Sequence, residues 1–145
     1  MPKFKVKLAA IGGVVGLTAG LMLTGGSPAS AASTEDIFTF NFYYPPGDNS
    51  TEIQVYDATK GIASGYADFV PDGDTLIAHD SGADGYGIEA HLSTSPERTA
   101  STRGHGSPYT AVAKGNLPEK TTYKFWVCAV KGTWSSCSGK QLVIS

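Results

Sequence analysis

The chain lacks several features that would place it in a common functional class. Its only cysteines, Cys128 and Cys137, stand near the C-terminal end, so no cysteine follows the N-terminal apolar run to carry a lipid. No twin arginine is present, which leaves the general secretion route as the simpler expectation. No block of like charges occurs either, and this excludes a charged interaction tail.

The first 31 residues are predicted to be a secretory signal peptide. Lys3, Lys5 and Lys7 form a positive segment, 8–24 is an apolar run containing several glycines, and 29–31 reads Ala-Ser-Ala. This succession is typical of a cleaved export signal. A membrane anchor is the alternative, but it needs about 20 predominantly apolar residues. We therefore expect the mature chain to begin at Ala32 or within a residue or two of it, and to be released outside the cell.

Residues 32–145 are expected to form a single domain. Export removes three of the eleven basic residues and none of the thirteen acidic ones, which leaves eight basic residues and a net charge of −5. A mildly acidic domain has no electrostatic attraction for nucleic acid or for anionic lipid. Neither is expected as a partner, and the sequence does not indicate an oligomeric state.

The mature chain is predicted to be an all-β, antiparallel, immunoglobulin-like sandwich of about seven or eight strands. It shows no helical periodicity, and short runs of β-branched and aromatic residues alternate with clusters of glycine, proline, aspartate and serine. Such spacing favours a sandwich. The polar stretch 93–108 is predicted to be a long mobile loop. The expected strands are 37–44, 52–56, 62–70, 75–79, 86–92, 109–113, 122–130 and 135–144.

A C-terminal hairpin joined by a Cys128–Cys137 disulfide is the most specific prediction. A hairpin that pairs the two cysteines has Gly132 and Thr133 as its two-residue loop, and glycine in the first position favours a type II′ turn. Counting back from that loop places the cysteines in a non-hydrogen-bonded pair, where Cα atoms are about 4.5 Å apart. This separation suits a disulfide, and an exported chain permits one.

The same register assigns side chains to two faces of the last two strands. If the pairing runs unchanged, one set faces the core and the other faces solvent, because side chains alternate along a strand. Trp126 then lies opposite Gly139, beside the disulfide on a partly solvated face. The predicted core set is Tyr123, Phe125, Val127, Ala129, Leu142 and Ile144, and the predicted outer set is Lys124, Trp126, Cys128, Gln141 and Val143.

Two resemblances follow from these residues. Leu117, followed six residues later by Tyr123, resembles the corner between strands E and F of fibronectin type III and immunoglobulin-like domains, which implies a tyrosine hydroxyl bonded to the backbone. The chain is also similar to small secreted actinobacterial proteins of no established function, through the turn 84–86 and the C-terminal stretches 126–128 and 137–139. Neither resemblance implies a catalytic residue.

Metal sites and catalysis are considered and not favoured. His79 and His91 could meet across a 75–92 hairpin beside Asp80, Asp84 and Glu89, but the spacing matches no fixed ligand pattern. A calcium site is weighed from four loop aspartates, since oxygen ligands suit calcium, yet turn chemistry explains them as well. No Gly-x-Ser-x-Gly nucleophile motif is present. We expect no metal, no cofactor and no enzyme. The four aspartates are Asp72, Asp74, Asp80 and Asp84.

Exposed aromatic residues give the best functional indication. Trp126, Tyr43 and Tyr56 are the predicted binding residues, with Trp134 as a further candidate at a rim. Tyrosine and tryptophan are frequent anchors for protein partners and have flat apolar faces with a polar edge, which suits sugars. The favoured function is a non-enzymatic extracellular binding module for a protein or a glycan. The alternatives are an inhibitor of an extracellular hydrolase that uses the 93–108 loop, and a small secreted enzyme.

Overall fold

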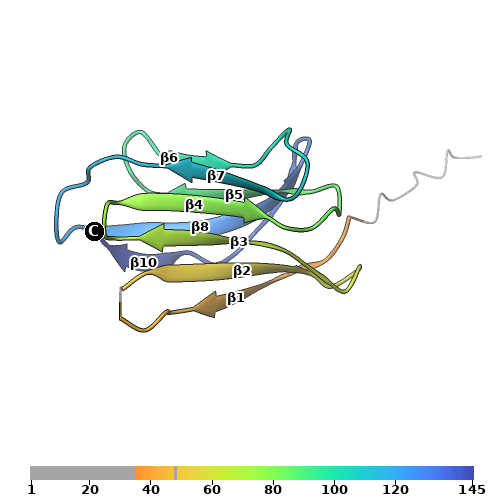
Figure 1. Cartoon of the computed structure of the whole chain (residues 1–145), viewed down its shortest axis with the longest axis horizontal. Coiled ribbons are helices and arrows are strands. Elements are labelled where there is room, and N and C mark those ends of the chain that lie inside the picture. The colour runs from red at the N-terminus through yellow and green to blue at the C-terminus, as the bar shows by residue number, and fades with distance from the viewer. Residues whose placement is uncertain (1–34, 48) are drawn as a thin grey trace, which may run out of the picture. The chain divides into compact units, whose positions relative to one another are not determined.

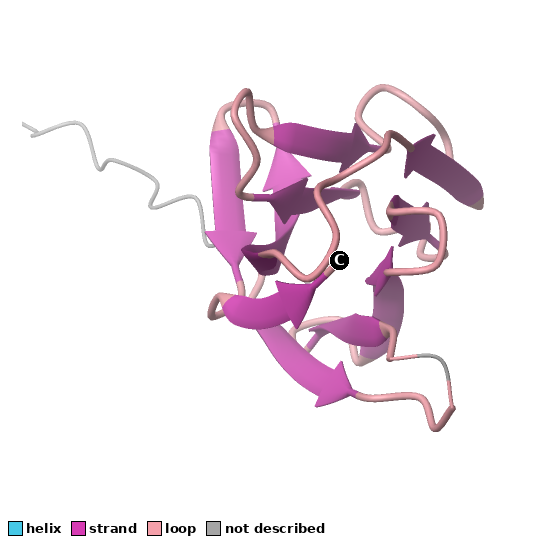
Figure 2. Ribbon diagram, turned by 90° about the vertical axis from the view of Figure 1, so that its left-hand side faces the viewer, coloured by secondary structure: helices cyan, strands magenta, loops and turns pink. Residues whose placement is uncertain are grey.

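Ten strands form two antiparallel sheets in the computed structural model, which describes residues 35–47 and 49–145. Figure 1 shows one sheet lying in front of the other, and Figure 2 shows the same strands after a 90° turn, with no helix in the described part. The strands are β1 (Phe38–Tyr43), β2 (Thr51–Asp57), β3 (Ile62–Val70), β4 (Thr75–Asp80), β5 (Gly87–Leu92), β6 (Arg98–Ser101), β7 (Tyr109–Ala113), β8 (Thr122–Lys131), β9 (Trp134–Cys137) and β10 (Gln141–Ile144).

We call the two layers sheet A and sheet B. Sheet A has the order β1-β2-β3-β4-β7, and sheet B has the order β10-β8-β5-β6, with β9 also paired to β8. The predicted all-β antiparallel sandwich is confirmed, with ten strands instead of seven or eight. The described residues form one compact unit. No described helix is long and apolar enough to cross a membrane, and the predicted signal peptide lies outside the described residues.

The core lies between the inner faces of the two sheets. Inward positions alternate along β2 and β4, as two-residue periodicity requires, and Ile53, Leu76 and Ile88 have no exposed surface. Phe69 of sheet A meets Phe125 of sheet B at a ring-centroid distance of 6.4 Å. These apolar contacts hold the layers together, since burial of apolar surface is the main favourable term in folding.

The C-terminal hairpin matches its prediction as far as the disulfide. Cys128 pairs with Cys137 and Lys131 with Trp134, and the two sulfurs are bonded, with Cα atoms 4.0 Å apart. Gly132 has a φ of 54°, and Thr133 is not among the residues with positive φ. This combination is the type II′ pattern. The disulfide is consistent with an extracellular protein.

The register changes by one residue beyond the disulfide, so the predicted faces of β10 are wrong. Val127 still pairs with Ser138, whose N–H donates to the Val127 carbonyl at 2.9 Å, but Gln141 faces Phe125. Gly139 and Lys140 together therefore stand opposite Trp126, which is a β-bulge. A one-residue shift exchanges the two faces of a strand. Leu142 and Ile144 are exposed, and Val143 is buried in the core.

Two further expectations about the strands are corrected. The polar stretch 93–108 contains β6, which pairs with β5, so it is not one long loop. Strands β4 and β5 do not form a hairpin, because β4 belongs to sheet A and β5 to sheet B. At the predicted corner, Leu117 is buried in the core, and the partly buried Tyr123 packs against the core cluster. Within the described residues no hydrogen bond from the Tyr123 hydroxyl to the backbone is found.

Candidate functional site

The predicted binding residues lie on opposite outer faces of the sandwich. Tyr43 and Tyr56 are on the outer face of sheet A, because their neighbours Phe42 and Val55 point to the other side of the same strands. Trp126 is on the outer face of sheet B, beside Cys128 and Val130. The structure therefore brings Tyr43 and Tyr56 to one surface and separates them from Trp126. Trp134 instead packs against Phe38 and Tyr86 at the edge of the core.

Trp126 is covered by two side chains of its own sheet. The ring of His91, its cross-strand partner, stacks on the indole at 5.1 Å with planes 6° apart. Lys140, which the bulge brings opposite Trp126, places Nζ 4.1 Å from the indole centroid, a cation–π geometry. The predicted face of Trp126 is confirmed, but only 9% of the residue is exposed. Its role in binding stays a prediction.

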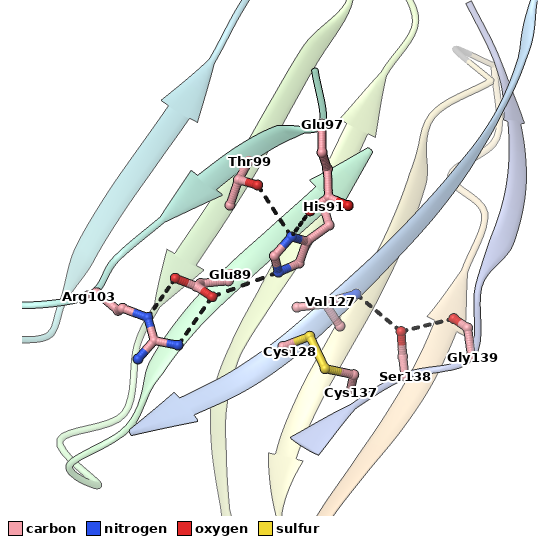
Figure 3. The surroundings of a disulfide bond; sticks show 10 residues. All are labelled: Glu89, His91, Glu97, Thr99, Arg103, Val127, Cys128, Cys137, Ser138 and Gly139. Atoms are coloured by element: carbon pink, nitrogen blue, oxygen red, sulfur yellow. Dashed lines mark hydrogen bonds and ion pairs between the residues drawn. A yellow bond between two sulfur atoms is a disulfide. The ribbon is translucent and has the colours of Figure 1, made fainter. Parts of the chain in front are cut away.

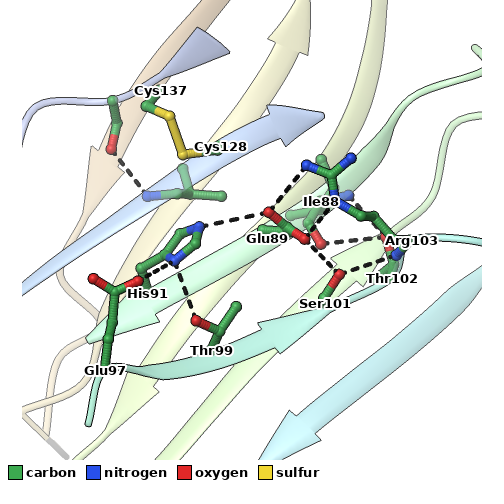
Figure 4. Close-up of polar contacts among 12 residues, drawn as sticks. Ile88, Glu89, His91, Glu97, Thr99, Ser101, Thr102, Arg103, Cys128 and Cys137 are labelled. Carbon is green, nitrogen blue, oxygen red and sulfur yellow. Dashed lines mark hydrogen bonds and ion pairs between the residues drawn. A yellow bond between two sulfur atoms is a disulfide. The ribbon is translucent and has the colours of Figure 1, made fainter. Parts of the chain in front are cut away.

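Charged side chains beside the disulfide form a continuous network on sheet B (Figure 3). Arg103 Nε lies 2.7 Å from Glu89 Oε1, and Glu89 Oε2 lies 3.8 Å from His91 Nε2. His91 Nδ1 lies 2.9 Å from Glu97 Oε1 and 3.3 Å from the Thr99 hydroxyl. Figure 4 shows Ser101 completing the group through its hydrogen bond to Glu89. The network ties β5 to the segment that contains β6.

This network stabilises the ionised form of Glu89. Partial burial raises the pKa of its carboxyl, but hydrogen bonds from Arg103 and Ser101 and the charge of Arg103 outweigh it, so the net pKa is lowered. In a catalytic proton relay, one ring nitrogen of a histidine contacts a hydroxyl and the other contacts a carboxylate. His91 does not have this arrangement. Glu97 and Thr99 both contact Nδ1, while Nε2 is too far from Glu89 for a hydrogen bond.

The outer face of sheet A carries a third tyrosine next to the two predicted ones. Tyr66 on β3 pairs with Gln54 on β2, and its ring stacks on His79 of β4 at 4.9 Å. The His79 ring is itself held by Thr110, with Nδ1 2.7 Å from the hydroxyl. We call the outward side chains Tyr43, Tyr56 and Tyr66 the tyrosine face. Tyr43 is 50% exposed and Tyr56 38% exposed.

A hollow of about 270 Å³ lies beside Tyr56 and Tyr66 on this face. Polar side chains from neighbouring strands line it, and Gln54 Nε2 donates to Glu52 Oε1 at 2.7 Å. Burial raises the pKa of the Tyr66 hydroxyl, and the nearby charges of Asp68 and Glu52 add to this effect. The phenol therefore stays neutral and able to donate a hydrogen bond.

A bulge in β3 directly precedes Tyr66, a residue that sequence reasoning did not single out. Ser64 and Gly65 are both buried in succession, and the register with β2 shifts between Val55 and Tyr56. A Cβ at Gly65 would lie 2.0 Å from the His79 carbonyl oxygen, so no side chain fits there. From Gly65 onward the strand alternates regularly, so Tyr66 points outward while Ala67 and Phe69 point into the core. The unusual glycine inside an otherwise apolar run was the available signal.

The metal ligands considered from the sequence do not lie together in the structure. His79 lies on the outer face of sheet A and His91 on that of sheet B, so the two cannot share an ion. Strand β4 separates Asp72 and Asp74 from Asp80 and Asp84, and Asp74 Oδ2 accepts the Leu117 N–H at 2.7 Å. In residues 35–47 and 49–145, no group of three or more histidine, cysteine or acidic side chains could hold a metal ion.

Asp80 has an unusual environment at the end of β4. It is 2% exposed, and its Oδ1 has no hydrogen-bond partner in the described part of the chain. Burial, with a smaller contribution from the charge of Asp84, raises the pKa of this carboxyl to about 6, although the Gly82 N–H opposes the shift. Asp80 lines a pocket of about 510 Å³ between three loop segments.

Replacing Asp80 by asparagine should stabilise the protein in alkaline buffer. The folded-state pKa of about 6 exceeds the ordinary 3.8. Between those two pH values the native state therefore binds more protons than the unfolded state, and the stability of the wild type falls as the pH rises through this range. Asparagine cannot ionise and still accepts the Gly82 N–H. Thermal melts should show Asp80→Asn melting several degrees higher at about pH 8, with the advantage shrinking as the pH falls from about 6 to about 4.

The exposed Asp72 provides the matched control for this measurement. Asp72→Asn should leave the difference between acid and alkaline melting temperatures as in the wild type. An Asp80→Asn effect of equal size at both pH values would show that ionisation of Asp80 is not the cause.

No protein-family model matches this sequence, and a comparison with curated proteins gives no match.

Proposed function

We propose that this protein is an exported, non-enzymatic binding module that holds a glycan on the tyrosine face of sheet A. The observation that carries the proposal is the placement of Tyr43, Tyr56 and Tyr66 on one outward surface with amide and carboxylate side chains between them. Tyrosine combines an apolar ring with a polar hydroxyl. A sugar likewise presents apolar C–H faces together with hydroxyl groups.

A glycan suits this surface better than a protein partner. The rings on the face are separated by Glu52, Gln54 and Asn41, so no continuous apolar patch forms. The buried centre of a protein interface is depleted in charged residues. Hydroxyl groups of a sugar can instead bond to these side chains while its ring lies on a tyrosine. The stacked His79 keeps Tyr66 fixed, which reduces the entropy lost when a ligand binds.

Export is part of the proposal and is supported at two places in the chain. Residues 1–31 have the charge pattern, apolar run and small-residue site of a signal peptide. The Cys128–Cys137 disulfide fits an oxidising compartment.

The immunoglobulin-like part of the fold is also proposed. Strands β3, β4 and β7 lie in one sheet, and β5, β8 and β10 lie in the other. This distribution agrees with strands A, B and E facing C, F and G in immunoglobulin-type sandwiches. The hairpin β1–β2 then extends the edge of strand A. The tyrosine face lies largely on this extension, so the proposed binding surface belongs to the part that the common fold lacks.

Tyr56→Ala and Tyr66→Ala should each weaken glycan binding by about tenfold or more, as loss of an aromatic anchor does. The probes are soluble xylan, hydroxyethyl cellulose and glycol chitin, and the measurement is retardation in affinity electrophoresis. Tyr44→Ala is the matched control, because Tyr44 is exposed at the end of β1 and outside the hollow.

Two results would overturn the placement. If none of the three polysaccharides retards the wild-type protein, the glycan assignment fails. If Trp126→Ala abolishes retardation while Tyr56→Ala and Tyr66→Ala do not, binding belongs to sheet B and the original expectation for Trp126 holds.

A further inference from the structure

The loops at one end of the sandwich enclose a pocket that the tyrosine face does not use. Residues 82–83 and 85–87 of one loop and the segments 102–107 and 130–132 line it, together with Asp80 at the end of β4. Its volume of about 510 Å³ lies in the range of small-molecule sites. Glycines occur in all three segments, among them Gly85, Gly104 and Gly132, so backbone groups can approach a ligand closely.

Asp80 gives this pocket a negative group with an unused oxygen. The carboxyl is almost fully buried, and Oδ1 lacks a partner among the described residues. The neighbouring Asp84 cannot supply a donor. Its Oδ2 accepts the Ser64 hydroxyl at 2.6 Å and its Oδ1 accepts the Tyr86 N–H at 2.9 Å. A buried charge without a partner is costly, so a cation in the pocket, close to this carboxylate, would offset the charge.

The lining also carries positive groups. Arg103 is already engaged, with Nη1 2.6 Å from the Gly132 carbonyl oxygen and Nε bonded to Glu89. Lys131 forms no ion pair with any residue that the structure describes, and its Nζ lies 4.7 Å from the centroid of the Tyr86 ring. Lys131 is exposed, whereas Asp80 is buried. The pocket therefore combines a buried anion with an exposed cation.

We propose that this pocket binds a small zwitterion of the size of an amino acid or a dipeptide, with its ammonium group beside the Asp80 carboxylate and its carboxylate directed to Lys131. A neutral sugar would supply a hydrogen bond but leave the buried charge uncompensated. An anion alone would meet the negative charge of Asp80. The site is separate from the tyrosine face and does not depend on glycan binding.

The test is a titration of the isotopically labelled protein by NMR with alanine, dialanine, ethylamine, acetate and glucose. At about 10 mM, a concentration that reveals even weak binding, alanine or dialanine should shift the amide signals of Gly85, Gly104 and Gly132. Ethylamine should shift them less, and acetate and glucose should leave them unchanged. Signals of Tyr56 and Tyr66 should not respond, which separates this site from the proposed glycan surface.

Two substitutions and a control complete the test. Asp80→Asn should weaken zwitterion binding by about tenfold or more, because the charged partner of the ammonium is lost. Lys131→Gln should weaken it less, and Asp72→Asn should have no effect. If Asp80→Asn does not fold, the wild-type Asp80 carboxyl carbon is followed instead. Bound alanine should lower the pKa of that carboxyl, since an adjacent positive charge favours the ionised form.

Three outcomes would overturn the proposal. They are no response to alanine or dialanine, an equal response to glucose or acetate, and undiminished binding by a folded Asp80→Asn variant.

Discussion

Phe125→Ala is expected to lower the free energy of unfolding by about 3–5 kcal/mol, the range for removing a large aromatic side chain from a core. Phe125 has no exposed surface and contacts Phe69 across the two sheets. Its removal leaves a cavity between the two sheets. The hydrogen-bonded strands keep each sheet in place, so the sheets do not close on this cavity. Urea denaturation should therefore show a lower midpoint with an unchanged slope.

Trp126→Ala should cost about half as much or less, although tryptophan is the larger residue. The indole lies outside the sandwich core, between His91 and Lys140. Solvent can fill the space that it leaves, so the cavity contribution is smaller, and the cation–π contact accounts for about 0.5–1 kcal/mol at an exposed site. A cost for Trp126→Ala equal to that for Phe125→Ala would mean that the outer face of sheet B contributes to stability as a core does.

The pair Phe125 and Trp126 also shows what the sequence determines. Alternation within β8 correctly separates the inner from the outer side chains, because the two-residue period of a strand depends only on local geometry. The same reasoning is wrong for Leu142, Val143 and Ile144. It assumed a register continued from the hairpin, and the bulge at Gly139 and Lys140 shifts that register by one residue. Nothing in the pattern of polar and apolar side chains indicates the extra residue.

Contacts between distant segments were the hardest to predict. A turn at 81–86 is compatible with a hairpin or with a crossing from one sheet to the other, since turn residues are the same in both. The crossing places His79 and His91 on opposite faces. Strand β6 was missed because Ala100 is its only buried residue. Its polar side chains belong to the outer face, where pairing with β5 decides the structure.

The candidate sites divide in the same way. Tyr56 could be proposed because β2 alternates without interruption. Tyr66 also alternates with the buried Ala67 and Phe69, but its stacking on His79 depends on the pairing of β3 with β4. Asp80 was considered only as a metal ligand, with calcium or beside the histidines. Its unpartnered oxygen depends on three loop segments that meet at one end of the sandwich. Neither composition nor residue spacing predicts that these three loop segments come together.

Removing the disulfide should lower the free energy of unfolding by about 2–3 kcal/mol, through the entropy of the short loop that it closes. The bridge spans nine positions of sequence, and its loss frees the unfolded chain while β8 and β9 keep their pairing. The double variant Cys128→Ala, Cys137→Ala should melt several degrees lower than the wild type.

Reductant separates the covalent bond from the side chains that carry it. It should lower the melting temperature of the wild-type protein toward that of the double variant, and it should leave the double variant unchanged. Before reduction, a thiol assay on the unfolded protein should find no free cysteine, in agreement with the bonded pair. Two titratable thiols in the purified, unreduced protein would contradict both the bond and the oxidising compartment that it supports.

Because Gly132 and the pairing of Lys131 with Trp134 form the turn without the sulfurs, the double variant should still fold with the same hairpin. The disulfide then stabilises a register that the turn already sets.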